Sequence, residues 1–365
     1  MISRRRILAV AATPLIQYAP ARAQEPLLVL GWDGYLDQPA IDRFKHATGI
    51  DVVLDVVGAY DEIFTQMRAG GIQRYSVIAP HHGLIPDLKM RGYIQPLDPN
   101  QIPHLAEIDS HFALPETTVI DGAKYGAPLI FDTCPALYNA DLLPEPPNNW
   151  LALASDLYTG KVGMLDDGFS HFNLWGRAIG AAHPPNLSAN EMLATTAILS
   201  ELKQNRVSHF TPYPADLVAQ LANGKAVIST TGWGGLTLLP DRGNANIKVV
   251  HLLPGDFSFV QVLAIPAEAP QLPAAHQFIN FMLSPNEQAT LANRTTRAIV
   301  NLAAVPMIDP AISAFTNYAD LDTVMAQSPP LGFPPIGETA DGTASYLDWA
   351  LAWDKVRSLK STAAP

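Results

Sequence analysis

Aromatic side chains and carboxylates recur where the apolar runs of this sequence end. A ring face attracts an ammonium group through its quadrupole, and an ammonium group that loses its water needs a carboxylate partner. This combination of side chains therefore suits the binding of an organic amine. Each aromatic, taken singly, is equally well explained by core packing, so the hypothesis rests on the group. Its members are Trp32, Asp33, Tyr35, His81, Phe131, Asp132, Asp167, Trp233 and Phe259.

The sequence lacks the motifs of common catalytic and metal sites. It contains no G-x-S-x-G, H-E-x-x-H or C-x-x-C pattern and no phosphate-binding loop of the P-loop type. Asp166 and Asp167 are neighbours at a strand end and point apart, so they do not form the facing carboxyl pair of a glycosidase. His81 and His82 are adjacent in a loop, where two histidines rarely reach one ion, so lining a cleft suits them better. We therefore expect no enzyme activity, no catalytic residue, no metal and no cofactor.

The first members of the group lie in a strand–loop–helix–strand module. The apolar run Leu27–Leu30 predicts a strand buried on both faces of a parallel sheet. A helix follows, capped by Asp37 or Gln38 and ended by Gly49, and Ile50–Val57 predicts a second strand. Ligands of open α/β sheets bind outside the carboxyl ends of the strands. The loop after the first strand, with two aromatics and a carboxylate, therefore lies where a ligand would be met.

The same alternation continues along the chain and predicts an α/β fold. Apolar strands over Tyr75–Ala79, Gly160–Leu165 and Ala226–Thr231 each run into a loop that carries members of the group. A terminal amphipathic helix is predicted over Ala344–Ser358. With 365 residues, 48% of them hydrophobic, the chain can bury one large or two medium cores, and we expect two lobes.

The amino terminus has the pattern of an export signal. Residues 3–8 are basic with adjacent arginines, residues 8–16 are apolar, and Ala21–Ala23 gives a small-x-small cleavage pattern before Gln24. The arginines suggest the twin-arginine route, although an ordinary secretory signal with adjacent arginines fits as well. Removal of residues 1–23 takes away four arginines and no acid, which lowers the formal charge from −11 to −15. This charge, without a long basic run, argues against a nucleic-acid partner.

Seven segments, in one order over nearly the whole mature chain, carry a resemblance to a known family. They are residues 48–57 (TGIDVVLDVV), 75–80 (YSVIAP), 125–139 (YGAPLIFDTCPALYN), 160–167 (GKVGMLDD), 263–266 (LAIP), 275–284 (AHQFINFMLS) and 301–304 (NLAA). The series resembles periplasmic solute-binding proteins of ABC importers, and among them the spermidine/putrescine-binding group with the type II fold.

This resemblance implies an architecture and a role. It implies two doubly wound α/β lobes joined by a hinge, with residues 24–131 and 256–305 in lobe 1 and residues 132–255 and 306–365 in lobe 2. The expected role is that of a periplasmic, monomeric protein that captures a small amine-containing organic solute, a polyamine or a related compound, in the interlobe cleft. The expected partner is an inner-membrane ABC permease. A zwitterionic or carboxylate-bearing solute is the alternative, and an exported enzyme a further one.

In the polyamine binders that the chain resembles, aromatics sandwich the methylene chain and carboxylates hold the ammonium ends. Trp32 and Tyr35 match the aromatics of the first loop, and Asp167 matches an amine-holding aspartate. Phe259 stands where an aromatic is expected, and Trp233 lies one residue from another such position.

Three positions depart from that pattern. Ser170 stands where an acid is expected, Gln261 replaces an aspartate, and Arg297 replaces a tyrosine. Fewer acids and an added guanidinium argue for a ligand with one cationic end, such as a zwitterion held by Asp167 or Asp132 and by Arg297. Alternatively Asp132 supplies the missing acid, or Arg297 is a surface residue at a helix end. The predicted ligand-binding set is Trp32, Asp33, Tyr35, His81, His82, Phe131, Asp132, Asp167, Ser170, Trp233, Phe259, Gln261 and Arg297.

Overall fold

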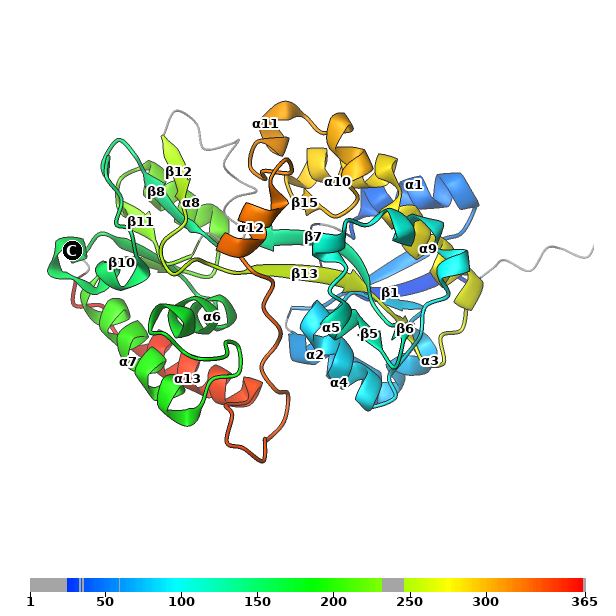
Figure 1. Ribbon diagram of the computed structural model, residues 1–365, viewed down its shortest axis with the longest axis horizontal. Helices are drawn as coiled ribbons and strands as arrows, with labels where there is room; N and C mark the ends of the chain where they lie inside the picture. Colours follow the sequence, from blue (N-terminus) through cyan, green and yellow to red (C-terminus); the bar gives the residue numbers. More distant parts are fainter. Residues whose placement is uncertain (1–24, 33, 35, 59, 232–245, 364–365) are drawn as a thin grey trace, which may run out of the picture.

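The chain forms two α/β lobes connected by long strands (Figure 1). The computed structural model describes residues 25–363 except 33, 35, 59 and 232–245. The expected export signal and three of the predicted site residues, Asp33, Tyr35 and Trp233, lie outside the described residues. No helix in the described part of the chain is long and apolar enough to cross a membrane.

The first lobe is built on the predicted amino-terminal module. Strand β1 (Leu27–Gly31) pairs in parallel with β2 (Val52–Val56) and with β3 (Val77–Ile78). Helix α1 (Gln38–Thr48) connects β1 to β2. Its cap is Asp37, whose side chain accepts a hydrogen bond from the amide of Ala40, and its end is Gly49, which adopts a left-handed φ of 76°. The local sequence signals thus produced the expected module.

Helices and short strands complete this lobe. Strand β14 pairs with β4, and an antiparallel bridge between Ile78 and Ala264 joins that pair to β3. The elements are α2 (Tyr60–Gln66), α3 (Ile72–Arg74), α4 (Ile85–Met90), β4 (Ile94–Gln95), α5 (Pro115–Thr118), β5 (Val119–Ile120), β6 (Ala123–Lys124), β14 (Ile265–Pro266), α9 (Leu272–Leu283), α10 (Pro285–Thr295), β15 (Ala298–Ile299), α11 (Pro310–Ser313) and α12 (Leu321–Gln327).

The second lobe has a five-stranded sheet in the order β10-β9-β11-β8-β12. Its core holds Trp150, Trp175 and Trp349, three of the largest fully buried side chains. Strand β10 was not predicted from the sequence. The elements are β8 (Ala136–Asn139), β9 (Val162–Leu165), α6 (Gly168–Ala178), α7 (Ala189–Asn205), β10 (Val207–Thr211), α8 (Pro214–Ala222), β11 (Ile228–Ser229), β12 (Ile247–Val250) and α13 (Tyr346–Ser358).

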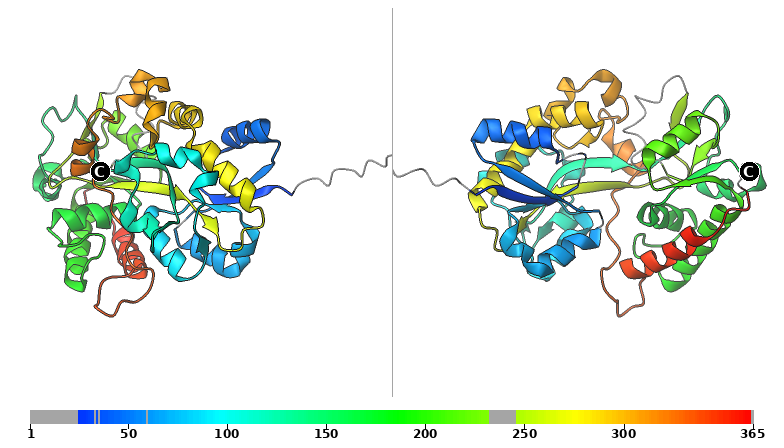
Figure 2. Two further views of the ribbon diagram at one scale, coloured as in Figure 1. Left: turned by 45° about the vertical axis from the view of Figure 1, so that its right-hand side comes forward. Right: turned by 180° about the vertical axis from the view of Figure 1, so that it is seen from behind.

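Three segments pass between the lobes. Two are the antiparallel strands β7 (Ala127–Thr133) and β13 (Ser258–Leu263), which Figure 1 shows running side by side from one lobe toward the other. The third is residues 328–345, which lead from α12 to α13 and which we call the strap. Beyond the strap, α13 packs along α6 and α7 of the second lobe (Figure 2).

The carboxy-terminal part of the chain divides differently from the sequence-based assignment, which put residues 306–365 in lobe 2. Helices α11 and α12 pack on the first lobe instead. The hydroxyl of Tyr318 accepts a hydrogen bond from the amide of Ile299 at 3.0 Å, Leu321 lies in one core cluster with Phe131, and His111 bonds Asp322 at 3.0 Å. Residues 306–327 therefore belong with lobe 1, because their apolar side chains are buried there.

Candidate ligand-binding cleft

A cleft of about 510 Å³ lies between the lobes. It is lined by residues from the ends of lobe-1 strands, from the crossing strand β13, from the start of α6 and from α13. Six of the predicted site residues line it: Trp32, Asp167, Ser170, Phe259, Gln261 and Arg297.

Four other predicted residues are not among those that line the cleft. They are His81, His82, Phe131 and Asp132, each no more than 6% exposed. These side chains support the wall rather than form it.

The register of the crossing strands gathers several of these residues on one surface. Phe259 of β13 lies directly opposite Asp132 of β7, and Gln261 follows two residues later on the same face. Ala298 of β15 pairs with Phe131 on the other side of β7, which brings Arg297 next to Asp132. The floor of the cleft is thus made by three strands from distant parts of the chain.

Arg297 and Asp132 form an ion pair on this floor. Nη1 of Arg297 lies 2.5 Å from a carboxylate oxygen of Asp132, and the two side chains are 16% and 7% exposed. Burial raises the pKa of the Asp132 carboxyl, and the guanidinium of Arg297 opposes that rise. Arg297 is therefore not the surface residue that one reading of the sequence expected, because it neutralises a buried carboxylate.

Asp167 lies at the beginning of α6, where the sequence analysis placed a loop. Its side chain accepts hydrogen bonds from the amide of Ser170 at 3.2 Å and from the hydroxyl of Ser170 at 2.5 Å, which makes it the N-cap of the helix. Ser170 thus orients Asp167. Asp167 has no ion-pair partner among the residues that the structure describes. It therefore presents an uncompensated negative charge to the cleft.

The aromatic wall includes side chains that the sequence analysis did not select. The ring of Tyr60, on α2, lies between Trp32 and Phe169, with centroid distances of 4.8 and 5.4 Å. Phe169 in turn stacks on Phe333 of the strap at 5.1 Å. Tyr60, Trp32 and Phe169 all line the cleft. These residues follow closely after the ends of strands β1, β2 and β9, and the carboxyl ends of such strands meet at the cleft. That position in the sequence could therefore have identified Tyr60 and Phe169 as site residues.

The two histidines stand behind this wall. His81 has no exposed surface, and its ring is surrounded by four aromatic rings whose centroids lie 5.6–6.5 Å from its own. These rings belong to Tyr60, Phe169, Phe259 and Phe333. Burial lowers the pKa of His81 well below its ordinary value and that of His82 to about 4. Both are therefore neutral at physiological pH. The described residues include no group of three or more His, Cys, Asp or Glu side chains that could hold a metal ion.

Helix α13 supplies a wall that the sequence analysis did not assign to the site. The cleft-lining residues of this helix are Tyr346, Trp349, Ala350, Trp353, Asp354 and Arg357. They recur at the spacing of one helical face, and we call them the α13 stripe. The amphipathic pattern of the helix was predicted. Its contact with the cleft depends on the path of the strap, for which the sequence carried no signal.

At the far end of the α13 stripe, the guanidinium of Arg357 is shared between two carboxylates. Arg357 lies 3.1 Å from Asp166 and 3.6 Å from Asp354, and the indole N–H of Trp353 donates to Asp166 at 2.7 Å. Asp166, unlike its neighbour Asp167, is therefore matched by a cation.

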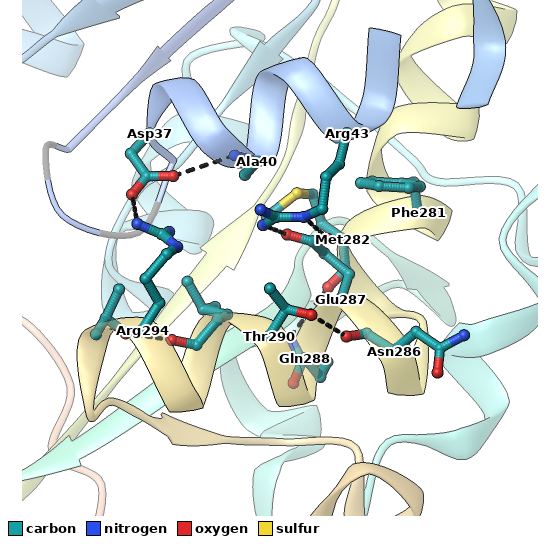
Figure 3. A network of polar contacts seen from close by, with 12 residues as sticks. Asp37, Ala40, Arg43, Phe281, Met282, Asn286, Glu287, Gln288, Thr290 and Arg294 are labelled. Carbon is teal, nitrogen blue, oxygen red and sulfur yellow. Dashed lines mark hydrogen bonds and ion pairs between the residues drawn. The ribbon is translucent and has the colours of Figure 1, made fainter. Parts of the chain in front are cut away.

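A polar network holds the two lobe-1 segments that reach the cleft. Asp37, at the end of the loop that carries Trp32, forms an ion pair with Arg294 at the end of α10 (Figure 3). Six residues further along the chain, in α1, Arg43 binds Glu287 through two hydrogen bonds of 2.8 and 2.5 Å. These contacts fix α1 to α10, and with them the positions from which Trp32 and Arg297 enter the cleft.

Comparisons with known proteins agree on the family. The family described as bacterial extracellular solute-binding protein matches residues 39–321. The spermidine/putrescine-binding periplasmic protein 1 of Haemophilus influenzae is 27% identical over 282 residues, which are 75% of each chain. The putrescine-binding periplasmic protein PotF of Escherichia coli is 26% identical over 307 residues, covering 79% of this chain and 81% of that protein.

A solved structure shows the same fold. The spermidine/putrescine ABC transporter substrate-binding protein PotD from Streptococcus pneumoniae superposes with a TM-score of 0.72 at 21% identity, over 92% of this chain and all of that chain. Its likeness establishes the two-lobed type II periplasmic-binding architecture. The match over residues 39–321 shows that the chain belongs to the bacterial extracellular solute-binding protein family.

Proposed function

We propose that this protein captures a small organic amine in its interlobe cleft and delivers it to an inner-membrane ABC permease. The curated relatives are named for binding spermidine and putrescine, so polyamines are the first compounds to consider. The proposal is one of binding and release, with no enzyme activity, by a protein exported to the periplasm through its twin-arginine-like signal. Export is tested by replacing Arg4 and Arg5 with lysine, which should leave the precursor in the cytoplasm.

The observation that carries the proposal is the carboxylate of Asp167. It faces an aromatic-lined cleft and has no cationic partner within the described part of the chain. An ammonium group would bind this carboxylate and the faces of Trp32 and Tyr60 together. Gln261 offers a second acceptor, since its amide oxygen is buried at the cleft without a hydrogen bond from any described residue.

Calorimetric titration of the mature protein with putrescine, spermidine and simple monoamines tests this role. At least one amine should bind, and Asp167→Asn should weaken it by about 10- to 100-fold, because a hydrogen bond to a charged group contributes about 1.5–3 kcal/mol. Asparagine caps helices as well as aspartate does, so the fold should be retained. Asp320→Asn, the same exchange at the cap of α12 outside the cleft, is the matched control. Equal affinity of the Asp167→Asn protein and the wild type would refute the proposal.

A zwitterionic solute is the second candidate, and the cleft position of Arg297 favours it. Its guanidinium lines the cleft while Nη1 binds Asp132, and a guanidinium has further N–H donors for a ligand carboxylate. Titration with ω-amino acids and with the matching amines that lack the carboxylate separates the two candidates. Tighter binding of the amino acids would favour the zwitterion.

A further inference from the structure

We propose that Phe333, in the strap, holds the two lobes against each other and thereby slows the release of a bound solute. The part that concerns release rests on the proposed function, whereas the part that concerns the lobes does not. Phe333 is not one of the residues that line the cleft. It acts through two rings that do line it, those of Tyr60 and Phe169, and is therefore a positioning residue.

The ring of Phe333 contacts both lobes at once. On the side of lobe 1, its centroid lies 5.1 Å from that of Tyr60 and 5.8 Å from that of His81. On the side of lobe 2, it lies 5.1 Å from that of Phe169, with 22° between the ring planes, and 5.0 Å from that of Tyr346. These separations are typical of favourable aromatic pairs. Because Phe333 is only 8% exposed, its ring is enclosed by these neighbours.

The backbone of the strap fixes the position of this ring. At Phe333 the strap lies so close to Gly83 of lobe 1 that a Cβ atom on Gly83 would come within 2.5 Å of the Phe333 nitrogen. Two residues further on, the carbonyl of Pro335 accepts a hydrogen bond of 2.7 Å from the amide of Tyr346, at the start of α13 in lobe 2. The strap is thus seated on both lobes. Moving the lobes apart must break the contacts of Phe333 with one of them, because the ring cannot remain with both.

These contacts also control access to the cleft. The rings of Tyr60 and Phe169 come from opposite lobes, lie 5.4 Å apart and line the cleft. Asp167 lies two residues before Phe169 and is carried by the same helix terminus. While Phe333 holds the two rings together, the carboxylate of Asp167 stays next to the aromatic wall of lobe 1. A solute held between them leaves when the lobes part, so the contacts of Phe333 contribute to the barrier for release.

The distance between the lobes, measured without any solute, tests the first part. Cys134 is the only cysteine in the sequence and is buried, so it does not compete for spin labels. Labels are attached through Met90→Cys in lobe 1 and Leu157→Cys in lobe 2, at side chains that are 71% and 76% exposed. In double electron–electron resonance, Phe333→Ala should shift the distances between the labels to longer values.

Two further variants separate this role from simple core packing. Phe333→Leu keeps most of the apolar volume and should shift the distances in the same direction by a smaller amount, and it replaces the alanine variant if that protein does not fold. Phe278→Ala is the matched control, because Phe278 is 1% exposed within the core of lobe 1. This control should lower the unfolding midpoint and leave the distances between the lobes unchanged.

Stopped-flow kinetics with putrescine and spermidine test the second part. Tryptophan fluorescence provides the signal, because Trp32 lines the cleft. Phe333→Ala should raise the dissociation rate at least about 5-fold and change the association rate less than about 2-fold, since changes at one binding site act mostly on dissociation. Phe278→Ala should leave both rates at their wild-type values.

The outcomes separate this inference from the proposed function. Unchanged distances in both Phe333 variants would overturn the inference, and so would a wild-type dissociation rate in Phe333→Ala. An equal shift of the distances in Phe278→Ala would also overturn it, because any loss of core packing would then have the same effect. If no amine binds, the proposed function fails, and the distances alone decide whether Phe333 holds the lobes together.

Discussion

The ion pair on the floor of the cleft allows a quantitative test. Arg297→Met removes the guanidinium and leaves Asp132, whose side chain is 7% exposed, as a buried carboxylate without its partner. Removing one member of a buried pair typically costs about 3–5 kcal/mol, because the remaining charge is uncompensated. An unfolding entropy of about 2.1 cal/mol/K per residue gives about 0.7 kcal/mol/K for roughly 340 residues. The midpoint of thermal unfolding should therefore fall by about 4–7 °C.

The pH dependence of this loss identifies its cause. Burial already raises the pKa of Asp132, and removing Arg297 takes away the group that opposes the rise. A carboxyl whose pKa is higher in the folded state binds more protons when folded, so stability falls as the pH rises between the unfolded and folded values. The loss in Arg297→Met should thus be largest at neutral and alkaline pH and should shrink as acid neutralises Asp132.

Calorimetric scans at pH 5 and pH 8 measure both quantities. Arg294→Met is the matched control, because Arg294 makes a more exposed ion pair with Asp37, and exposed pairs contribute about 0–1 kcal/mol. Adding Asp132→Asn to Arg297→Met should recover most of the lost stability, since the buried charge is then gone. A loss below about 1 kcal/mol at pH 8 would mean that Asp132 is not held as a buried charge, and the argument would fail.

Three further changes test other parts of the structure. Hydrogen bonds to Asp322 and Asp109 raise the pKa of His111, so this side chain stabilises the fold below its unfolded pKa and loses that effect as the pH rises through the folded value. His111→Asn should therefore lower the unfolding midpoint more at pH 5.5 than at pH 8.5. An equal loss at the two pH values would contradict this. Arg43→Met leaves the carboxylate of Glu287, which is 3% exposed, without its bidentate partner. The free energy of unfolding measured in urea should fall by about 3–5 kcal/mol. A fall below about 1 kcal/mol would contradict the buried-pair argument. In Gly83→Ala the new methyl group would lie 2.5 Å from the backbone nitrogen of Phe333, so the strap must shift. Hydrogen exchange of the backbone amides in residues 328–345 should therefore become faster. Unchanged exchange would show that the strap is not held at Gly83.

Local signals predicted the first lobe because each of them acts over a few residues. Asp37 caps α1 and Gly49 ends it for reasons that are complete within that helix. The strand-end rule likewise placed Trp32 and Asp167 at the cleft, since parallel strands direct their carboxyl ends to one edge. Strand β10 was missed because its short, polar-containing sequence VSHFT is a strand only by pairing with β9.

Features that depend on distant segments could not be predicted in this way. The strap carries the chain past Phe169 and delivers α13 to the cleft, and nothing in residues 328–345 specifies that destination. An amphipathic helix shows that one face is buried, but not which partner it meets. The α13 stripe was therefore visible as a pattern and not as a site.

The partner of Arg297 shows why charges counted along a sequence can mislead about a ligand. From the sequence, an added arginine at the site argued for a carboxylate on the solute. In the fold, the pairing of β15 with β7 puts Arg297 beside Asp132, which is 165 residues away, and that carboxylate already neutralises it. A ligand responds to charges that remain uncompensated after folding, because matched pairs gain little by exchanging partners. Among the described residues of this cleft, Asp166, Asp167 and Asp354 outnumber Arg357, the lining arginine that Asp132 does not neutralise, so the positive end of the solute is specified more firmly than any negative one.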